Sequence, residues 1–111
     1  MLTIIKTLVV TGLVTLIASL AGGEVFSDAA KLGTNVGAMQ YCADCCADDD
    51  DKKKYKLLRF KTLKEYGDLK SDEKAKALIL RKKAEDEGEY LGKKLDKDRC
   101  DSIRKMLQLK Y

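Results

Sequence analysis

Four cysteines are the residues of this chain best suited to chemistry. Cys42, Cys45 and Cys46 lie close together, and Cys100 lies near the C-terminus. Cysteine side chains form disulfides, bind soft metal ions or exchange thiols. The chain has no histidine, which excludes Ser-His-Asp and Cys-His catalytic groups within it. The cysteines therefore carry most of the chemistry that the sequence offers.

Cys42 and Cys45 have the C-x-x-C spacing of thiol oxidoreductases. A reactive cysteine needs its thiolate stabilised, usually by a helix N-terminus or by cationic neighbours. This pair falls near the end of a predicted helix and beside Asp44 and Asp48–Asp51, and both surroundings disfavour a thiolate. We therefore predict no catalytic residue and no enzyme.

The alternative is a soft-metal site, with three thiolates at helical spacing (Cys42, Cys45 and Cys46) and Cys100 as a fourth ligand. Structural zinc sites with four cysteines normally use two separated C-x-x-C pairs. The second pair is missing, so we predict no metal site and no cofactor.

The N-terminal residues have the pattern of a secretory leader. Met1–Lys6 carries one positive charge, Thr7–Leu20 is apolar, and Ser19 and Ala21 are small residues at positions −3 and −1. This pattern predicts a signal peptide over residues 1–21 and one exported domain over residues 22–111, periplasmic or secreted. The alternative is an uncleaved anchor over residues 1–23, which makes a single-pass membrane protein with an exported C-terminal domain.

Exported chains with an even number of cysteines are ordinarily oxidised, so all four cysteines are disulfide candidates. A bond between the neighbours Cys45 and Cys46 strains the backbone, which makes the connectivity that contains it the least favoured. Cys46–Cys100 is favoured because both residues lie on apolar stripes, and Cys42–Cys100 follows closely.

Apolar residues recur at steps of three and four, which is typical of amphipathic helices. The pattern predicts helices over residues 25–47, 52–66, 71–95 (with a break at Gly88 or Gly92) and 97–110; a strand around Tyr55–Leu57 is an alternative. The fold class is all-α: a small antiparallel bundle of about four helices, stapled by one or two disulfides and preceded by the N-terminal hydrophobic helix. Gly33 and Gly37 indicate either a close helix neighbour or a local break.

The second helix has a narrow apolar arc of Leu57, Phe60 and Leu63, the side by which it would pack. The last helix has an expected buried face of Cys100, Ile103, Met106 and Leu107.

Seven cationic residues with no acid among them lie in the second predicted helix. They are Lys52, Lys53, Lys54, Lys56, Arg59, Lys61 and Lys64. They could face an anionic membrane or phosphate groups, but a solvated helix face neutralised by the neighbouring Asp48–Asp51 is favoured. The net charge of +4 is too small to indicate nucleic acid as a partner.

Residues Asn35–Cys42, together with Arg99–Ile103, resemble the YjjA-like family of small exported bacterial proteins. Those proteins also place a Tyr-Cys pair, here Tyr41-Cys42, after a helix of small residues, and a second cysteine in a final helix. The resemblance implies a Cys42–Cys100 bridge and moves the preference narrowly to that pairing. It implies no activity, substrate or catalytic residue.

Together these features predict a non-enzymatic protein of the bacterial cell envelope that acts by binding or structural association with a protein partner. One alternative is a periplasmic stress or acid chaperone. Another is an accessory subunit of a membrane complex, anchored by an uncleaved N-terminal helix.

Overall fold

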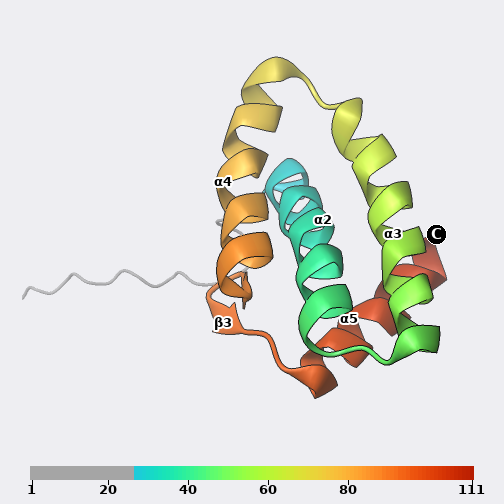
Figure 1. Ribbon diagram of the computed structural model, residues 1–111. Coiled ribbons are helices and arrows are strands. Elements are labelled where there is room, and N and C mark those ends of the chain that lie inside the picture. The colour runs from blue at the N-terminus through green and yellow to red at the C-terminus, as the bar shows by residue number, and fades with distance from the viewer. Residues whose placement is uncertain (1–26) are drawn as a thin grey trace, which may run out of the picture.

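The computed structural model describes residues 27–111, so the predicted leader and its cleavage point lie outside the described residues. The described part contains α2 (Asp28–Cys45), α3 (Asp49–Gly67), α4 (Ser71–Glu87), β2 (Glu89–Tyr90), β3 (Lys93–Lys94) and α5 (Lys97–Lys110) (Figure 1). The prediction of a mostly helical bundle of about four helices is confirmed. Within residues 27–111, no helix is long and apolar enough to cross a membrane.

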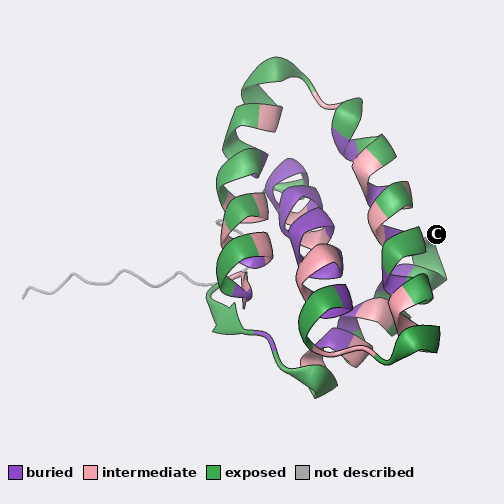
Figure 2. Ribbon diagram, in the orientation of Figure 1, coloured by how far each residue is buried: buried purple, intermediate pink, exposed green. Residues whose placement is uncertain are grey.

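Helix α2 is the centre of the bundle. It packs against α4, α3 and α5, while α4 and α3 stand on either side of it and α5 crosses one end (Figure 1). Buried residues are concentrated on α2 (Figure 2), where Val36, Ala38, Met39 and Cys42 are fully enclosed. Helices α3 and α4 therefore bury their inner faces mainly against α2, whereas α5 packs against both α2 and α3.

Two glycines on one face of α2 allow α4 to come unusually close. A Cβ atom added at Gly33 would lie 2.9 Å from the Ala77 Cβ, and one added at Gly37 would lie 2.9 Å from the Ala84 Cβ. Both separations are too short for real carbon atoms. The sequence left open a close neighbour or a local break, and the structure shows the close neighbour in an unbroken helix.

Acidic caps set the starts of α3 and α5. The Asp48 carboxylate accepts a hydrogen bond from the Asp51 N–H (2.8 Å), and the Asp96 carboxylate accepts one from the Arg99 N–H (2.8 Å). These side chains satisfy backbone N–H groups that have no partner inside the helix. Further acids in the first turn of each helix interact favourably with the positive end of the helix dipole. Helix α3 therefore starts three residues before the predicted Lys52, whereas α5 has the predicted bounds.

The predicted break in the third helix occurs at Gly88. This glycine has φ +66° and caps α4 in the left-handed conformation, which costs glycine little. The chain then forms the hairpin of β2 and β3, where Glu89 pairs with Lys94. The prediction of helix over residues 88–95 is therefore wrong. Leu95 is nevertheless buried, as its place in the predicted apolar stripe indicated.

The predicted buried face of α3 is wrong. Leu57 and Phe60 are 53% and 61% exposed, and Leu63 is half-buried. The buried residues of α3 are Tyr55, Leu58, Thr62 and Tyr66. Three of these carry hydroxyl groups, which can be buried when they are hydrogen-bonded; the Thr62 hydroxyl, for example, donates to the Leu58 carbonyl (2.8 Å). The strand alternative around Tyr55 is also wrong, because these residues are helical.

In α5, Cys100, Ile103 and Leu107 are buried as predicted, but Met106 is 50% exposed. Steps of three and four from Cys100 already reach Ile103 and Leu107, so this narrow stripe leaves Met106 at its edge.

Candidate functional site

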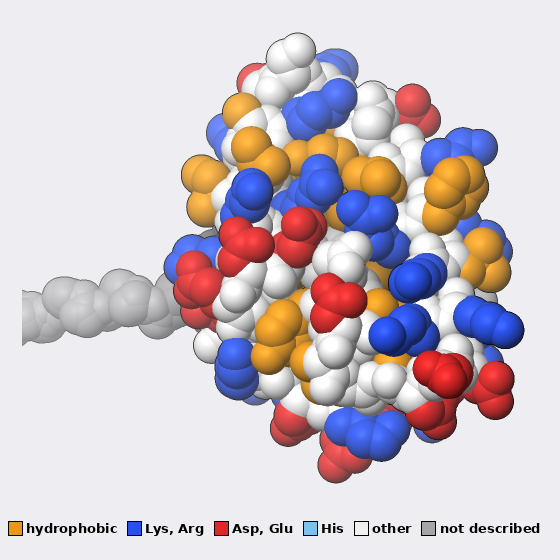
Figure 3. Space-filling view, viewed as in Figure 1, with side chains coloured by type: hydrophobic (Ala, Val, Ile, Leu, Met, Phe, Trp, Pro, Cys, Tyr) orange, Lys and Arg blue, Asp and Glu red, His pale blue; other side chains and the backbone are white. Residues whose placement is uncertain are grey.

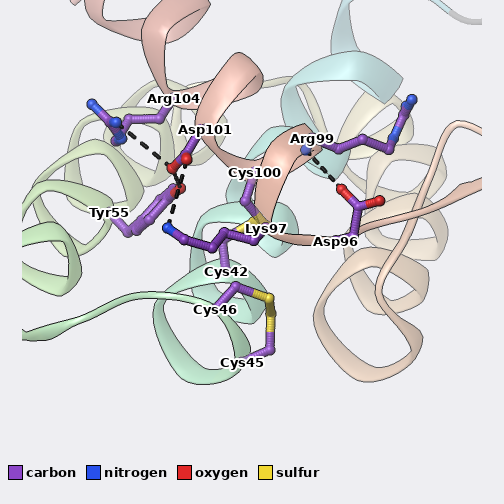
Figure 4. Close-up of a disulfide and its surroundings, with 10 residues drawn as sticks. All are labelled: Cys42, Cys45, Cys46, Tyr55, Asp96, Lys97, Arg99, Cys100, Asp101 and Arg104. Atoms are coloured by element: carbon purple, nitrogen blue, oxygen red, sulfur yellow. Dashed lines mark hydrogen bonds and ion pairs between the residues drawn. A yellow bond between two sulfur atoms is a disulfide. The ribbon is translucent and has the colours of Figure 1, made fainter.

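Cys42 and Cys100 form a disulfide that joins the last turns of α2 to the first turn of α5 (Figure 4). Their Cα atoms are 5.8 Å apart, and neither residue is exposed. Met39, Tyr55 and Leu95 belong to the same buried cluster. The bond is therefore a covalent link inside the core.

The other two cysteines, Cys45 and Cys46, are bonded to each other (Figure 4). This is the connectivity that we expected least, and the Cys46–Cys100 pair favoured from the apolar stripes is not formed. The physical reason is that α2 ends at Cys45. Cys46 caps the helix with non-helical backbone angles (φ −137°, ψ 8°), so it leaves the stripe, and Cys42 one turn earlier lies opposite Cys100.

The sulfur atoms of Cys45, Cys46 and Cys100 lie within 4.8 Å of one another. All four cysteines belong to the part of the chain that the structure describes, and all are in disulfides. A disulfide sulfur carries no thiolate charge, which is what soft metal ions and thiol exchange require. In this oxidised state, the chemistry of the cysteine cluster is crosslinking.

A polar network lies beside the buried disulfide (Figure 4). The Tyr55 hydroxyl of α3 donates a hydrogen bond to the Asp101 carboxylate of α5 (3.0 Å). The Lys97 Nζ and an Arg104 guanidinium nitrogen each lie 3.7 Å from that carboxylate. The network therefore ties α3 to α5 at the point where the disulfide ties α2 to α5.

The network shifts two pKa values. Burial, followed by the hydrogen bond to Asp101, raises the pKa of Tyr55 to about 12. The same hydrogen bond, and then the charges of Lys97 and Arg104, lower the pKa of Asp101 below its usual value. Sequence reasoning missed this pair because its two residues are 46 positions apart and follow no local pattern.

All seven residues of the predicted basic cluster lie on α3. Lys53, Lys54, Lys56 and Lys64 are exposed, and the other three are partly buried. Among the described residues, only Lys54 of the seven has a carboxylate side chain in ion-pair range, that of Asp51 at 3.5 Å. The structure therefore brings the cluster together on one helix, where six of its seven members lie outside ion-pair range of any described carboxylate.

Two surface hollows lie away from these residues. One, of about 420 Å³, is lined by Asp28, Lys31, Glu65 and Lys110 among others, so it presents no single sign of charge. The other, of about 460 Å³, lies between α3 and α4. There the Arg81 guanidinium stands over the Tyr66 ring at 5.3 Å from its centre, a cation–π contact.

No protein-family model matches this chain, and comparison with curated proteins and with solved structures gives no match. The resemblance to the YjjA-like family therefore stays a prediction. The fold and the site define a small helical bundle whose central helix is covalently linked to its last helix.

Proposed function

We propose that the chain is an exported, non-enzymatic envelope protein that acts by binding or structural association. The observation that supports this proposal is the buried Cys42–Cys100 disulfide. Disulfides persist in oxidising compartments and are common in small exported domains whose cores are marginal. A predicted leader over residues 1–21 and membership of the YjjA-like family belong to the same proposal.

Exposed apolar side chains support binding as the mode of action. Leu57 and Phe60 on α3, and Leu78 and Ile79 on α4, are all more than 40% exposed. Figure 3 shows hydrophobic side chains across the face that carries α4 and α3. Apolar surface of this kind marks interaction sites.

Mass spectrometry of native protein under non-reducing conditions tests export and oxidation together. We expect a chain that begins at residue 22, that is four hydrogens lighter than its reduced form, and that yields a linked Cys42–Cys100 peptide. Full-length protein with free thiols contradicts the proposal. A full-length mass with both disulfides supports instead the accessory subunit held by residues 1–23.

A second experiment tests whether the cysteines act as the reactive thiols of an oxidoreductase. We expect no alkylation of any cysteine by a mild reagent until a reductant is added, because all four are in disulfides. Rapid alkylation of Cys42 or Cys45 in the native protein would support an oxidoreductase instead.

A periplasmic acid chaperone is the second candidate function, and the Asp101 network favours it. Asp101 faces Tyr55, Lys97 and Arg104, and its protonation removes the charge that holds these groups together. Acid would then loosen α3 from α5 and expose apolar surface. If the purified protein at pH 2–3 binds no hydrophobic dye and protects no client from aggregation, this candidate is wrong.

A further inference from the structure

The outward side of α3 combines two features that the sequence placed on different sides of the helix. Leu57 and Phe60 are more than half exposed, on the side opposite the buried Tyr55, Leu58, Thr62 and Tyr66. At 3.6 residues per turn, the cations that share this side with them are Lys53, Lys56, Lys61 and Lys64, and the exposed acids Asp49 and Asp50 lie on the same side at the start of the helix. We call Leu57, Phe60 and the four lysines the α3 outer face.

The α3 outer face is strongly cationic. Residues 52–64 contain seven cationic side chains and no acid, and Figure 3 shows hydrophobic side chains among Lys and Arg side chains along the α3 edge. Lys53, Lys56 and Lys64 make no ion pair with any residue that the structure describes. Lys61 donates a hydrogen bond to the Tyr111 carbonyl at 3.2 Å.

We infer that the α3 outer face docks on the surface of an anionic phospholipid bilayer. Lysines attract the negative lipid headgroups, while Leu57 and Phe60 at the centre of the face can enter the boundary between headgroups and acyl chains. A soluble phosphate ligand offers nothing to cover the two apolar side chains. Six of the seven cations are lysines, whose compact charge suits a fluid array of headgroups better than fixed bidentate recognition.

Helix α4 provides the internal comparison. It exposes Ile79 to 62%, nearly the same as the 61% of Phe60. However, α4 carries as many acids as cations, five of each, whereas α3 carries seven cations and four acids. Apolar exposure is therefore similar on the two helices, and only α3 adds an excess of positive charge.

The inference rests on the proposed export of the chain, which brings this face to the outer surface of a membrane. The mass measurement above tests export by itself, so the two proposals can fail separately. The chain contains no tryptophan, so one added tryptophan is a unique fluorescent reporter. Phe60→Trp reports on the α3 outer face, and Ile79→Trp is its control at equal exposure.

Both full-length variants are mixed with vesicles of phosphatidylcholine alone or of equal parts phosphatidylcholine and phosphatidylglycerol. We expect the F60W emission to shift to the blue and to be quenched by brominated lipid only with the anionic vesicles. The I79W emission stays unchanged with both. Raising the salt from about 0.05 M to about 0.5 M reverses the F60W shift, because salt screens the attraction. Attachment through residues 1–26 alone leaves the F60W emission unchanged.

Charge neutralisation completes the test. K56Q/K61Q/K64Q in the F60W background should weaken binding about 100-fold, because each lysine near an anionic surface contributes about fivefold. K76Q/K82Q/K93Q removes equal charge elsewhere and should change binding less than about threefold, with circular dichroism confirming that both variants fold. The inference is overturned if the F60W emission stays unchanged or if I79W responds equally. It is also overturned if binding to neutral vesicles is equal, or if inorganic phosphate alone gives the same F60W shift.

Discussion

The Cys42 and Cys100 side chains carry the largest single contribution to stability that we assign to a residue pair. Their bond spans 58 positions of sequence, and closing a loop of that length removes much of the conformational freedom of the unfolded chain. The chain-entropy model gives about 4 kcal/mol for such a loop. A described domain of this size has a total stability of only several kcal/mol, so the disulfide is decisive.

Cys42→Ala/Cys100→Ala should therefore lower the free energy of unfolding by about 4 kcal/mol, measured by urea unfolding followed by circular dichroism. Cys45→Ala/Cys46→Ala is the matched control. Its bond joins adjacent residues and closes almost no loop, so we expect a change below about 1 kcal/mol. Equal losses in the two double variants would contradict the assignment.

Tyr55 and Asp101 make the stability depend on pH at both extremes. The raised pKa of Tyr55, about 12, means that its contribution is complete below pH 10 and is lost as the pH rises towards 12. The lowered pKa of Asp101 makes the stability fall in acid instead. Its contribution is present above the usual carboxyl pKa and is lost as the pH falls through the lower folded value.

Tyr55→Phe should lower the free energy of unfolding by about 1–2 kcal/mol between pH 5 and 9, because the hydrogen bond to the Asp101 carboxylate is lost. The difference from the unaltered protein should shrink below pH 4 and above pH 10. Chemical unfolding across this pH range measures it. Tyr41→Phe is the control, because the Tyr41 hydroxyl donates no hydrogen bond to the described residues. A pH-independent difference would show that the carboxylate is not the partner that matters.

At the scale of the helices, the start of α3 was missed by three residues because the cap at Asp48 was not recognised. The cap at Asp96 and the glycine at Gly88 act within one turn, so they can be recognised without knowing the fold. Helix α5 was predicted with its observed bounds for this reason. The hairpin was missed because its two-residue strands are too short to show any periodicity.

The orientation of α3 was not predictable from apolar residues alone. Its buried side is made largely of tyrosine and threonine. These residues can be buried when their hydroxyl groups are hydrogen-bonded and otherwise tend to stay in water. The hydroxyl partner of Tyr55 is Asp101, 46 positions away, and that of Tyr66 is the Lys74 carbonyl, eight positions away on the next helix. The same dependence on distant neighbours decided the cysteine pairing.

Gly37→Ala should lower the free energy of unfolding by about 1–3 kcal/mol, because its new Cβ forces α4 away from α2. Gly67→Ala is the control at the end of α3, where a Cβ meets nothing within 4 Å. There we expect no loss, and up to about 1 kcal/mol of gain from helix propensity. Thermal unfolding distinguishes the two variants. A neutral Gly37→Ala would mean that the helices are not in close contact.

At the scale of the whole molecule, one helix serves as the core and three others cover it. Helix α2 is where the disulfide, the close glycine contact and half of the buried described residues meet. This division leaves the outward sides of α3 and α4 free to carry exposed apolar and charged groups without loss of the core. The core and the exposed apolar and charged side chains are therefore separated within a short chain.

The Cys42–Cys100 bond also closes residues 42–100 into a covalent ring that contains α3, α4 and the hairpin. Asp48–Lys52 within this ring spells the cleavage sequence of an enteropeptidase-type protease. We expect a cut after Lys52 to leave one band on a non-reducing gel and two bands after reduction. Separation of the fragments without reductant would contradict the pairing. A chain of this design can be cut once anywhere inside the ring and still remain one molecule.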